Sequence, residues 1–394
     1  MMARVERDVF HKTLHKAFQA REKKPSLPMC QLVKLSVSGD HAGCLMSIEA
    51  YDGDNYFKAL VQATDCRRGE VIVDCQTLLR IIGEARGPVT LSTIEEDTKV
   101  SLKVFSDGCS YLLHSTPDDA GFFKEPKIGK LMASFSLGGK ELREMINRVF
   151  YASGHSDTRY TLNSVPFIFT DDGLILVGTD GHRMALLKKK METSTSLPER
   201  RNFIAPRRWL TSLMQIVRIC DKEPEIAFTD SHALLKCGTT MLISRLVDGT
   251  YPKYDQVIPK KCESFVVFRK ADMIRAIEKL KAIPIERKSY GTKILACHLG
   301  FSLSATLQGD YSAETDFKVE SFDGPELEFG MNIHYLHEAL LKCKSSIVSL
   351  GMTDQLSPMH LTETLDNESK VDLGNETYEA VVMPMKLDGV RRMS

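Results

Sequence analysis

The sequence repeats one long unit three times. In each third, a predicted amphipathic helix comes first, over residues 7–21, 139–152 and 269–281, and Phe10, Leu142 and Met273 occupy equivalent positions 132 and 131 residues apart. A second predicted helix follows, over residues 74–86, 205–219 and 332–344. Apolar residues three and four apart share one helix face, so each helix is expected to cover a core. An array of whole domains favours a scaffold over a single catalytic cleft.

The segments between these helices are predicted to form β-strands. They are short, apolar or alternating runs separated by turns, six to eight in each repeat, such as Leu45–Ala50 and Lys99–Val104. Two helices with short antiparallel strands predict an α+β fold in every repeat. Breaks near Pro126 and Pro259 place the domains at residues 1–128, 129–259 and 260–387, followed by a tail at 388–394.

Composition points to an ordinary globular protein of the cytoplasm. Hydrophobic residues make up 43% and charged residues 26% of the 394 residues. Charged residues near the start interrupt any signal peptide, and no apolar run reaches membrane-spanning length. The ten cysteines are scattered and form no C-x-x-C pair. We therefore expect reduced, buried thiols, Cys44 among them, rather than a disulfide framework or a zinc site.

Charge is unevenly distributed although the total is balanced. The chain has 52 basic and 52 acidic residues, but the six predicted helices carry 19 Lys and Arg against 8 Asp and Glu, a net +11. The rest of the chain must carry −11. If the helices share a face, that face is positive and suited to phosphate, whereas solvated helix surfaces are the alternative explanation.

Motifs for chemistry are weak. The segment Leu137–Glu141 contains the Gly-Lys of a phosphate loop but lacks its other required residues, and it is interpreted as a helix start. His182 lies between Asp180 and Arg183 and could act as a general base, yet no nucleophile or metal ligand is spaced to match. A turn that shapes a binding surface is the better interpretation. The segment Val381–Leu387, with two methionines around a proline, is typical of an adaptable peptide-binding surface.

Three strings together resemble the bacterial sliding clamp, the beta subunit of DNA polymerase III. They are Thr179–Ala185 (TDGHRMA), Ser244–Lys260 (SRLVDGTYPKYDQVIPK) and Val381–Leu387 (VVMPMKL). Their order matches the family, and the threefold repeat covers nearly the whole chain. The resemblance implies a head-to-tail homodimer whose six domains form a ring around duplex DNA, with helices lining the hole and sheets outside.

The resemblance also implies a pocket for a short partner peptide that carries a glutamine and apolar anchors. Its expected residues are Leu162, Thr179, Gly181, His182, Arg183, Met184, Pro252, Val257, Tyr290, Asn332, Tyr335, Leu356, Pro358, Val381, Val382, Met383, Pro384 and Met385. Tyr290 stands where the family often has another aromatic residue, and Gln256 stands where a basic residue is common.

Two further surfaces follow from the resemblance and from charge. For DNA contact it implies Lys24 and the loop residues His155, Ser156, Arg159 and Tyr160, while Arg207 and Arg208 are added from charge alone. For the dimer seam it implies Tyr111 and Leu113 on one edge and Ile283 and Ile285 on the other. The family commonly ends at the position of Leu387, so Asp388–Ser394 is an extra tail.

The function that the resemblance implies is a non-enzymatic processivity clamp without cofactor or metal. Its partners would be double-stranded DNA, a second copy of the chain, the replicative polymerase catalytic subunit, the clamp loader, and other replication and repair proteins with short clamp-binding peptides, and no membrane. Two alternatives remain open: a monomeric peptide-binding scaffold that does not encircle DNA, and a nucleotide-processing enzyme that uses His182 and Asp180.

Overall fold

The computed structural model describes residues 1–21, 27–39, 44–96, 99–118, 121–195, 201–282, 291–307, 311–364 and 375–386. Four expected site residues lie outside these ranges, namely Lys24, Ile283, Ile285 and Tyr290. The tail Asp388–Ser394 also lies outside them. The chain divides into two compact units: residues 1–143, 193–198 and 205–246 form the first, and residues 144–192, 199–204 and 247–394 form the second.

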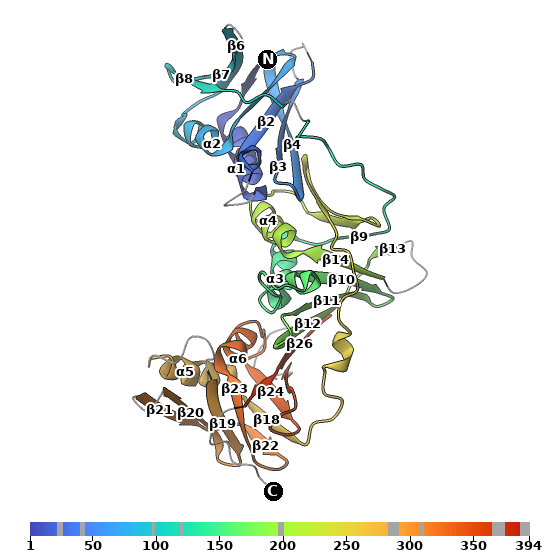
Figure 1. Cartoon of the computed structure of the whole chain (residues 1–394), viewed down its shortest axis with the longest axis vertical. Coiled ribbons are helices and arrows are strands. Elements are labelled where there is room, and N and C mark those ends of the chain that lie inside the picture. Colours follow the sequence, from blue (N-terminus) through green and yellow to red (C-terminus); the bar gives the residue numbers. More distant parts are fainter. Residues whose placement is uncertain are drawn as a thin grey trace. The chain divides into compact units, whose positions relative to one another are not determined.

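All six predicted helices are present within the described ranges (Figure 1). They are α1 (Arg7–Ala20), α2 (Cys75–Glu84), α3 (Gly139–Phe150), α4 (Arg207–Arg218), α5 (Lys270–Leu280) and α6 (Ile333–Leu340). The apolar stripe of each helix faces a core, as Phe10 and Leu14 of α1 do with no exposed surface. Asp74 caps α2 by accepting a hydrogen bond from the Thr77 amide at 2.6 Å, which satisfies one of the free amides at the helix start.

The first unit is built on a sheet of 13 strands among the described residues. These strands are β1 (Met2–Val5), β2 (Leu32–Val37), β3 (Cys44–Tyr51), β4 (Asn55–Arg67), β5 (Gly69–Asp74), β6 (Val89–Glu96), β7 (Lys99–Ser106), β8 (Cys109–His114), β9 (Ala133–Ser136), β13 (Ser194–Thr195), β15 (Glu225–Phe228), β16 (His232–Cys237) and β17 (Thr240–Arg245). β4 pairs antiparallel with β17, so the first two predicted domains share one sheet, and β8 ends the sheet.

The second unit holds two antiparallel sheets in its described part. The larger has nine strands in the order β14-β10-β11-β12-β26-β25-β24-β18-β22, and the smaller has five in the order β21-β20-β19-β23-β27. The nine are β10 (Ser164–Thr170), β11 (Gly173–Thr179), β12 (Arg183–Lys190), β14 (Arg201–Pro206), β18 (Ser264–Arg269), β22 (Ser321–Asp323), β24 (Ile347–Met352), β25 (Met359–Glu363) and β26 (Glu376–Val382). The five are β19 (Gly291–Cys297), β20 (Gly300–Leu307), β21 (Tyr311–Phe317), β23 (Leu327–Asn332) and β27 (Pro384–Met385).

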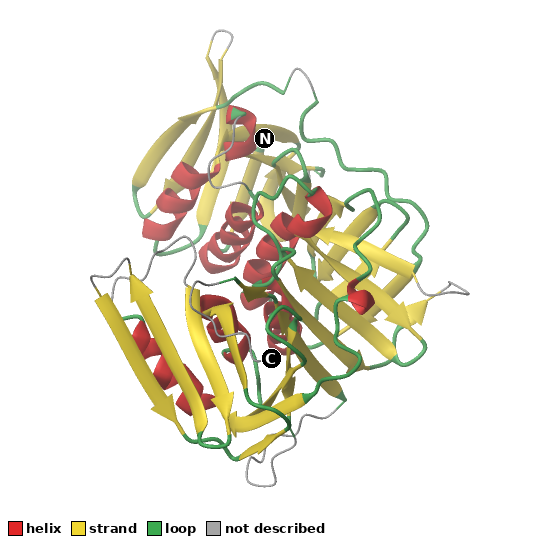
Figure 2. Cartoon of the chain, turned by 60° about the horizontal axis from the view of Figure 1, so that its bottom comes forward, coloured by secondary structure: helices red, strands yellow, loops and turns green. Residues whose placement is uncertain are grey.

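Helices cover sheets within each unit. In the first unit α1 packs on β3 and β4 and against α2 and α4, and in the second unit α5 packs on β20, β21 and α6. Figure 2 shows the helices, in red, against the strands, in yellow. The fold is therefore α+β with antiparallel sheets, as the sequence predicts. Within the described residues, no helix is both long and apolar enough to cross a membrane.

The prediction of uniformly reduced cysteines is wrong for Cys44. Cys44 and Cys66 form a disulfide, with their Cα atoms 6.4 Å apart. The physical reason is strand pairing: β3 and β4 are antiparallel neighbours with Cys44 opposite Ala63, which brings two cysteines 22 residues apart in sequence within bridging range. Cys30, Cys75, Cys237 and Cys343 are buried and form no disulfide, as expected.

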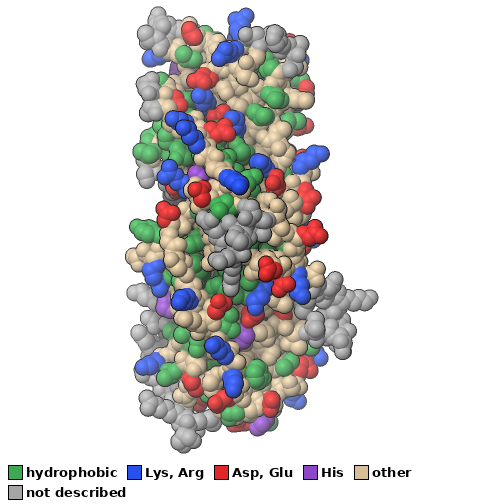
Figure 3. Space-filling view, turned by 90° about the vertical axis from the view of Figure 1, so that its right-hand side faces the viewer, with side chains coloured by type: hydrophobic (Ala, Val, Ile, Leu, Met, Phe, Trp, Pro, Cys, Tyr) green, Lys and Arg blue, Asp and Glu red, His purple; other side chains and the backbone are tan. Residues whose placement is uncertain are grey.

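The face shown in the space-filling view carries charges of both signs, and neither sign dominates it. Lys, Arg, Asp and Glu side chains are interspersed there (Figure 3). Some of the excess positive charge of the helices is compensated locally, because Lys12 of α1 pairs with Asp221 just after α4. A count of charges along the sequence does not register such pairs, so it overstates how positive a helix surface is.

Candidate functional site

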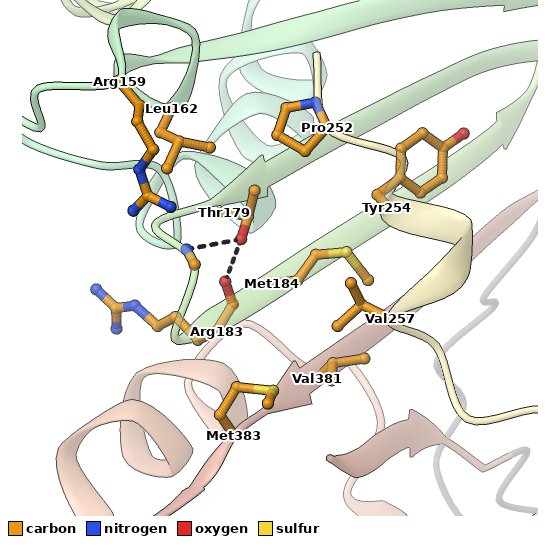
Figure 4. Close-up of a pocket in the computed structure, with 11 residues that line it drawn as sticks. Arg159, Leu162, Thr179, Arg183, Met184, Pro252, Tyr254, Val257, Val381 and Met383 are labelled. Atoms are coloured by element: carbon orange, nitrogen blue, oxygen red, sulfur yellow. Dashed lines mark hydrogen bonds between the residues drawn. The ribbon is translucent and has the colours of Figure 1, made fainter. Parts of the chain in front are cut away.

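A small cavity of about 120 Å³ lies within the second unit (Figure 4). Its lining is mostly apolar and comes from segments far apart in sequence: Arg159, Leu162, Thr179, Gly181, Arg183, Met184, Pro252, Tyr254, Val257, Val381 and Met383. The volume is below the range of sites for whole drug-sized molecules. It suits the side-chain anchors of an extended chain instead.

The turn between β11 and β12 forms one wall of this cavity. Thr179 Oγ1 accepts a hydrogen bond from the Gly181 amide at 3.1 Å and donates one to the Arg183 carbonyl at 2.7 Å (Figure 4). Asp180 Oδ1 accepts from the His182 and Arg183 amides at 2.9 and 3.0 Å. Gly181 has a φ of +89°, a conformation that glycine adopts without steric cost. The sequence Thr-Asp-Gly-His-Arg thus specifies a fixed turn.

Arg183 is held from several sides. Its guanidinium donates to Asp180 at 3.0 Å, to Glu338 of α6 and to the Tyr151 carbonyl at 2.9 Å. It also lies over the Tyr335 ring, 4.5 Å from the ring centroid. Burial disfavours the charged guanidinium, but the hydrogen bond and charge of Glu338 outweigh it and raise the pKa of Arg183. Arg183 is therefore a permanently charged, rigid part of the wall.

The apolar floor of the cavity belongs to the core of the second unit. Met184 is 3% exposed and Val381 1%, and both pack in one cluster with Ile168, Val177 and Tyr254. Val257, by contrast, is 40% exposed at the rim. Tyr254, in the 3₁₀ turn Tyr254–Gln256, is a lining residue that the sequence reasoning missed. Tyr254 lies between Pro252 and Val257 in the Ser244–Lys260 segment, and this position could have indicated that it lines the cavity.

The structure brings together part of the expected pocket. The expected residues that line the cavity are Leu162, Thr179, Gly181, Arg183, Met184, Pro252, Val257, Val381 and Met383. The other expected residues within the described ranges do not line it. Asn332 caps α6 by accepting from the His334 amide at 3.0 Å, Tyr335 stacks under Arg183, and Pro384 and Met385 form β27 beside β23. Leu356 is 64% exposed, Pro358 is half-buried and Val382 is buried.

His182 contacts its neighbours in the turn through its backbone amide and carbonyl. Its amide donates to Asp180, its carbonyl accepts from the Met383 amide at 2.9 Å, and the residue is exposed. The hydrogen bond to Met383 ties the turn to the end of β26. In the described part of the chain, no group of three or more His, Cys, Asp or Glu side chains is arranged to hold a metal ion.

The expected DNA-contacting residues fall into different settings. Arg159 lines the cavity, and its guanidinium pairs with Asp157 at 3.0 Å and reaches the Asp180 carbonyl at 3.3 Å. The hydrogen bond from Arg159 lowers the pKa of Asp157 to about 2. His155 and Ser156 are exposed, and Tyr160 is 78% exposed. These loop residues thus flank Arg159, which lines the cavity, in the same unit.

Arg207 and Arg208 begin α4 in the first unit. Arg208 pairs with the almost fully buried Asp52 at 3.0 Å and with Asp54 at 2.9 Å, so its charge is compensated by the β3–β4 hairpin. Arg207 is half-buried. Choosing Arg208 from charge alone therefore overlooked a structural ion pair.

Strand β8 presents an apolar edge, but not through Leu113. Leu113 is 8% exposed and faces the core, whereas Tyr111 and Leu112 are 38% and 52% exposed. Phe105 on the neighbouring β7 adds an apolar side chain that is 47% exposed. Leu113 sits opposite buried Leu102 in the β7–β8 ladder, so within one chain it has little exposed surface, and its place in the dimer seam stays a prediction.

An α+β fold of repeated helix-and-sheet units with a small, mostly apolar surface cavity is the architecture of a binding protein. Two family profiles match the chain and identify the family. The profile described as "DNA polymerase III beta subunit, central domain" matches residues 136–253, and the one described as "DNA polymerase III beta subunit, C-terminal domain" matches residues 255–386.

Relatives and solved structures agree with the profiles. The chain is 26% identical over 384 residues to a protein of Pseudomonas aeruginosa named beta sliding clamp, covering 97% of this chain and 99% of the relative. A crystal structure of the DNA polymerase III subunit beta from that organism matches with a TM-score of 0.85, covering 98% of this chain and 100% of that one. Another, 25% identical and bound to griselimycin, has a TM-score of 0.83, with the same coverage of both chains. The chain belongs to the bacterial DNA polymerase III beta subunit family, the sliding clamps.

Proposed function

We propose that this chain is a DNA sliding clamp, which tethers the replicative polymerase to duplex DNA and so confers processivity. The observation that carries the proposal is the cavity built by the Thr179–Met184 turn, Pro252–Val257 and Val381–Met383, since these are the segments of the family that dock partners. The clamp acts without catalysis: a closed ring need not grip bases, and long-range attraction to phosphate permits sliding.

Partners dock through a short extended peptide with a glutamine and apolar anchors. The cavity has a buried apolar floor at Met184 and Val381, and a charged residue, Arg183, fixed at its wall. Such pockets concentrate binding energy in a few anchors. The occupants are the polymerase catalytic subunit, the clamp loader, and other replication and repair proteins. The loop residues His155, Ser156 and Tyr160 provide the rim of this site or a contact to DNA.

Peptide titration tests the docking site. Deleting the chain from Met383 onward removes one lining residue and the strand β27, so peptide affinity should fall by about 2–4 kcal/mol in binding free energy. Deleting only 388–394 is the matched control for the loss of the end of the chain. If the full chain and the Met383 deletion bound the peptide with equal affinity, this docking site would be wrong. Tighter binding by the control would mean that the tail shields the pocket.

Two chains close the ring, with domains at residues 1–128, 129–259 and 260–387 and a tail at 388–394. A head-to-tail contact closes when its rotation allows, and three domains in each chain then give six around the hole. The seam joins the β8 edge, with Tyr111 and Leu113 and the exposed Leu112 beside them, to Ile283 and Ile285 of the partner subunit. The helices face DNA, Lys24 and Arg207 contact its phosphates, and the protein works in the cytoplasm.

Retention on DNA tests encirclement. After loading, the protein should stay on a circular duplex through a salt wash and should slide off the same duplex once it is cut. A monomeric scaffold that binds peptides would be retained on neither. Equal loss from circular and linear duplex, by a protein that still binds the partner peptide, would contradict the ring while leaving the docking site intact.

A further inference from the structure

One acidic side chain outside the cavity is bonded to the cavity wall. Glu338 lies on α6 and is not among the residues that line the cavity. Its carboxylate accepts a hydrogen bond from the guanidinium of Arg183, which begins β12 and does line the cavity. His334 Nε2 is 3.7 Å from the same carboxylate, so Arg183 is the closer partner. A charged group of α6 therefore pairs with a residue of the wall.

The hydrogen bonds of the Arg183 guanidinium differ in what they connect. The bond to Asp180 at 3.0 Å stays within the β11–β12 turn. The bonds to the Tyr151 carbonyl at 2.9 Å and to Glu338 reach outside the turn. Figure 4 shows the Arg183 side chain pointing away from Met184, so the guanidinium holds the turn on the side away from the apolar floor. Of the two outside partners only Glu338 is charged, and hydrogen bonds between charged groups are the stronger ones.

The part of α6 that carries Glu338 is itself fixed. The neighbouring Ala339 carbonyl accepts a hydrogen bond from the Tyr378 hydroxyl at 3.3 Å, and that hydroxyl lies 2.8 Å from the Tyr151 hydroxyl. Tyr378 is 2% exposed and belongs to β26, the strand that pairs with β12. The Glu338 carboxylate is therefore a fixed point against which the turn is held.

We propose that Glu338 is a positioning residue for partner binding, which acts through Arg183 to hold the β11–β12 turn in the conformation that forms the cavity wall. The inference rests on the proposed function, since it assigns a further residue to the same docking site. The Arg183 carbonyl accepts from Thr179, and the Arg183 amide donates to Asp180. Releasing the side chain of Arg183 therefore loosens the bonds that shape the wall, and a less ordered wall binds more weakly.

The expected effect is partial, because other contacts also hold the turn. The His182 carbonyl accepts from the Met383 amide at 2.9 Å, and β12 stays paired with β26. Glu338→Gln removes the charge and keeps the size of the side chain. Peptide affinity should then fall about fivefold, the effect of a partly exposed ion pair, rather than be abolished.

Peptide titration of the intact protein tests this residue. The probe is a synthetic hexapeptide with one glutamine and two leucines, and Glu338→Gln should bind it about fivefold more weakly than the native protein. Glu320→Gln is the matched control. The Glu320 side chain is 43% exposed and that of Glu338 30%, and Glu320 pairs with Arg269 at 2.7 Å in the same unit, where neither partner lines the cavity. The control should bind as the native protein does.

A double-mutant cycle separates positioning from a general loss of stability. In an Arg183→Met background the group through which Glu338 acts is gone, so Glu338→Gln should cause no further loss of affinity. A purely structural role predicts the same loss in both backgrounds. Native affinity in Glu338→Gln, or an equal loss in both backgrounds, would overturn the proposal.

Amide hydrogen exchange of the free protein tests the hold on the turn without any peptide. The Gly181, His182 and Arg183 amides are hydrogen-bonded within the turn, so Glu338→Gln should speed up their exchange severalfold and Glu320→Gln should not. A native protein that bound no peptide but showed this difference would contradict the docking function and support the hold of Glu338 on the turn. Equal exchange in the native protein and Glu338→Gln would overturn the positioning role, whatever the titration gave.

Discussion

Arg148 of α3 carries a charge that is almost wholly buried, with 5% of its side chain exposed. It pairs with Glu363 at 2.6 Å and with Glu376, donates to the Lys342 carbonyl at 3.0 Å, and lies 4.5 Å from the centroid of the Tyr378 ring. Removing one partner of a buried network leaves uncompensated charge. Arg148→Met should therefore lower the free energy of unfolding of the second unit by about 3 kcal/mol, measured by urea denaturation.

The carboxylates that remain explain that loss and provide its control. Adding Glu363→Gln and Glu376→Gln to Arg148→Met removes the buried negative charges, so stability should partly return. Burial raises the pKa of Glu376, but Arg148 and Lys344 outweigh it and the net shift is downward. A lowered carboxyl pKa gives stability that is present above the unfolded value, near pH 4, and is lost as pH falls further. The native protein should thus approach the Arg148→Met variant in acid, and a constant difference down to pH 3 would contradict the pairing.

Gly181 links backbone conformation to peptide binding. At φ +89° a side chain is strained, and a Cβ would lie 3.1 Å from the Arg159 guanidinium at the cavity wall. Gly181→Ala should weaken peptide affinity severalfold by shifting the turn. Gly108→Ala is the matched control, because Gly108 has φ +76° and open space around it, in the other unit. Both variants should lose about 1 kcal/mol of stability. If titration found equal peptide affinity for the two, Gly181 would have no role in shaping the pocket.

At the scale of elements, strand β8 is a sheet edge with exposed apolar side chains. Unpaired edges invite pairing with another chain. Leu112→Lys, at a residue 52% exposed, should convert dimers into monomers in analytical ultracentrifugation without unfolding the chain. Leu45→Lys is the control, since Leu45 is 45% exposed on β3, which has neighbours on both sides. A dimer that persists in Leu112→Lys at low concentration would remove β8 from the seam.

The local pattern of apolar residues predicted the helices better than it predicted the short strands, which are fixed by pairing with distant strands. The six helices were predicted because each buries an apolar stripe with a period that sequence displays directly, as Leu142, Met145 and Ile146 do in α3. β1, β9 and β14 were missed, because strands of four to six residues carry little periodic signal and are fixed by pairing at a distance.

The site shows the same division between local and distant information. The Thr179–Met184 turn is specified by neighbouring residues and could be read from sequence. Tyr254 joins the cavity, Arg208 pairs with Asp52, and Cys44 bonds to Cys66 only because folding brings distant segments together. The resemblance to a family supplied the pocket, and no rule of composition or spacing could have supplied those three contacts.

At the scale of the whole molecule, affinity for DNA and retention on DNA are separate properties. The chain is neutral overall, with 52 basic and 52 acidic residues, so attraction to phosphate depends on where the charges lie. Lys24→Ala with Arg207→Ala should flatten the dependence of open-duplex binding on salt, by up to about one unit of slope for each phosphate that is no longer neutralised. Arg208 is left in place, because removing it would expose Asp52 and Asp54 and confuse the result. Lys188→Ala, on β12 and paired with Glu379, is the sheet-side control and should leave the slope unchanged. Retention of the loaded double variant on circular duplex should match that of the native protein, because a closed ring holds DNA by topology. Fluorescence anisotropy across a salt series measures affinity for open duplex, and a salt wash of circular duplex measures retention. An unaltered salt slope in the double variant would refute the prediction that the helices form a positive face.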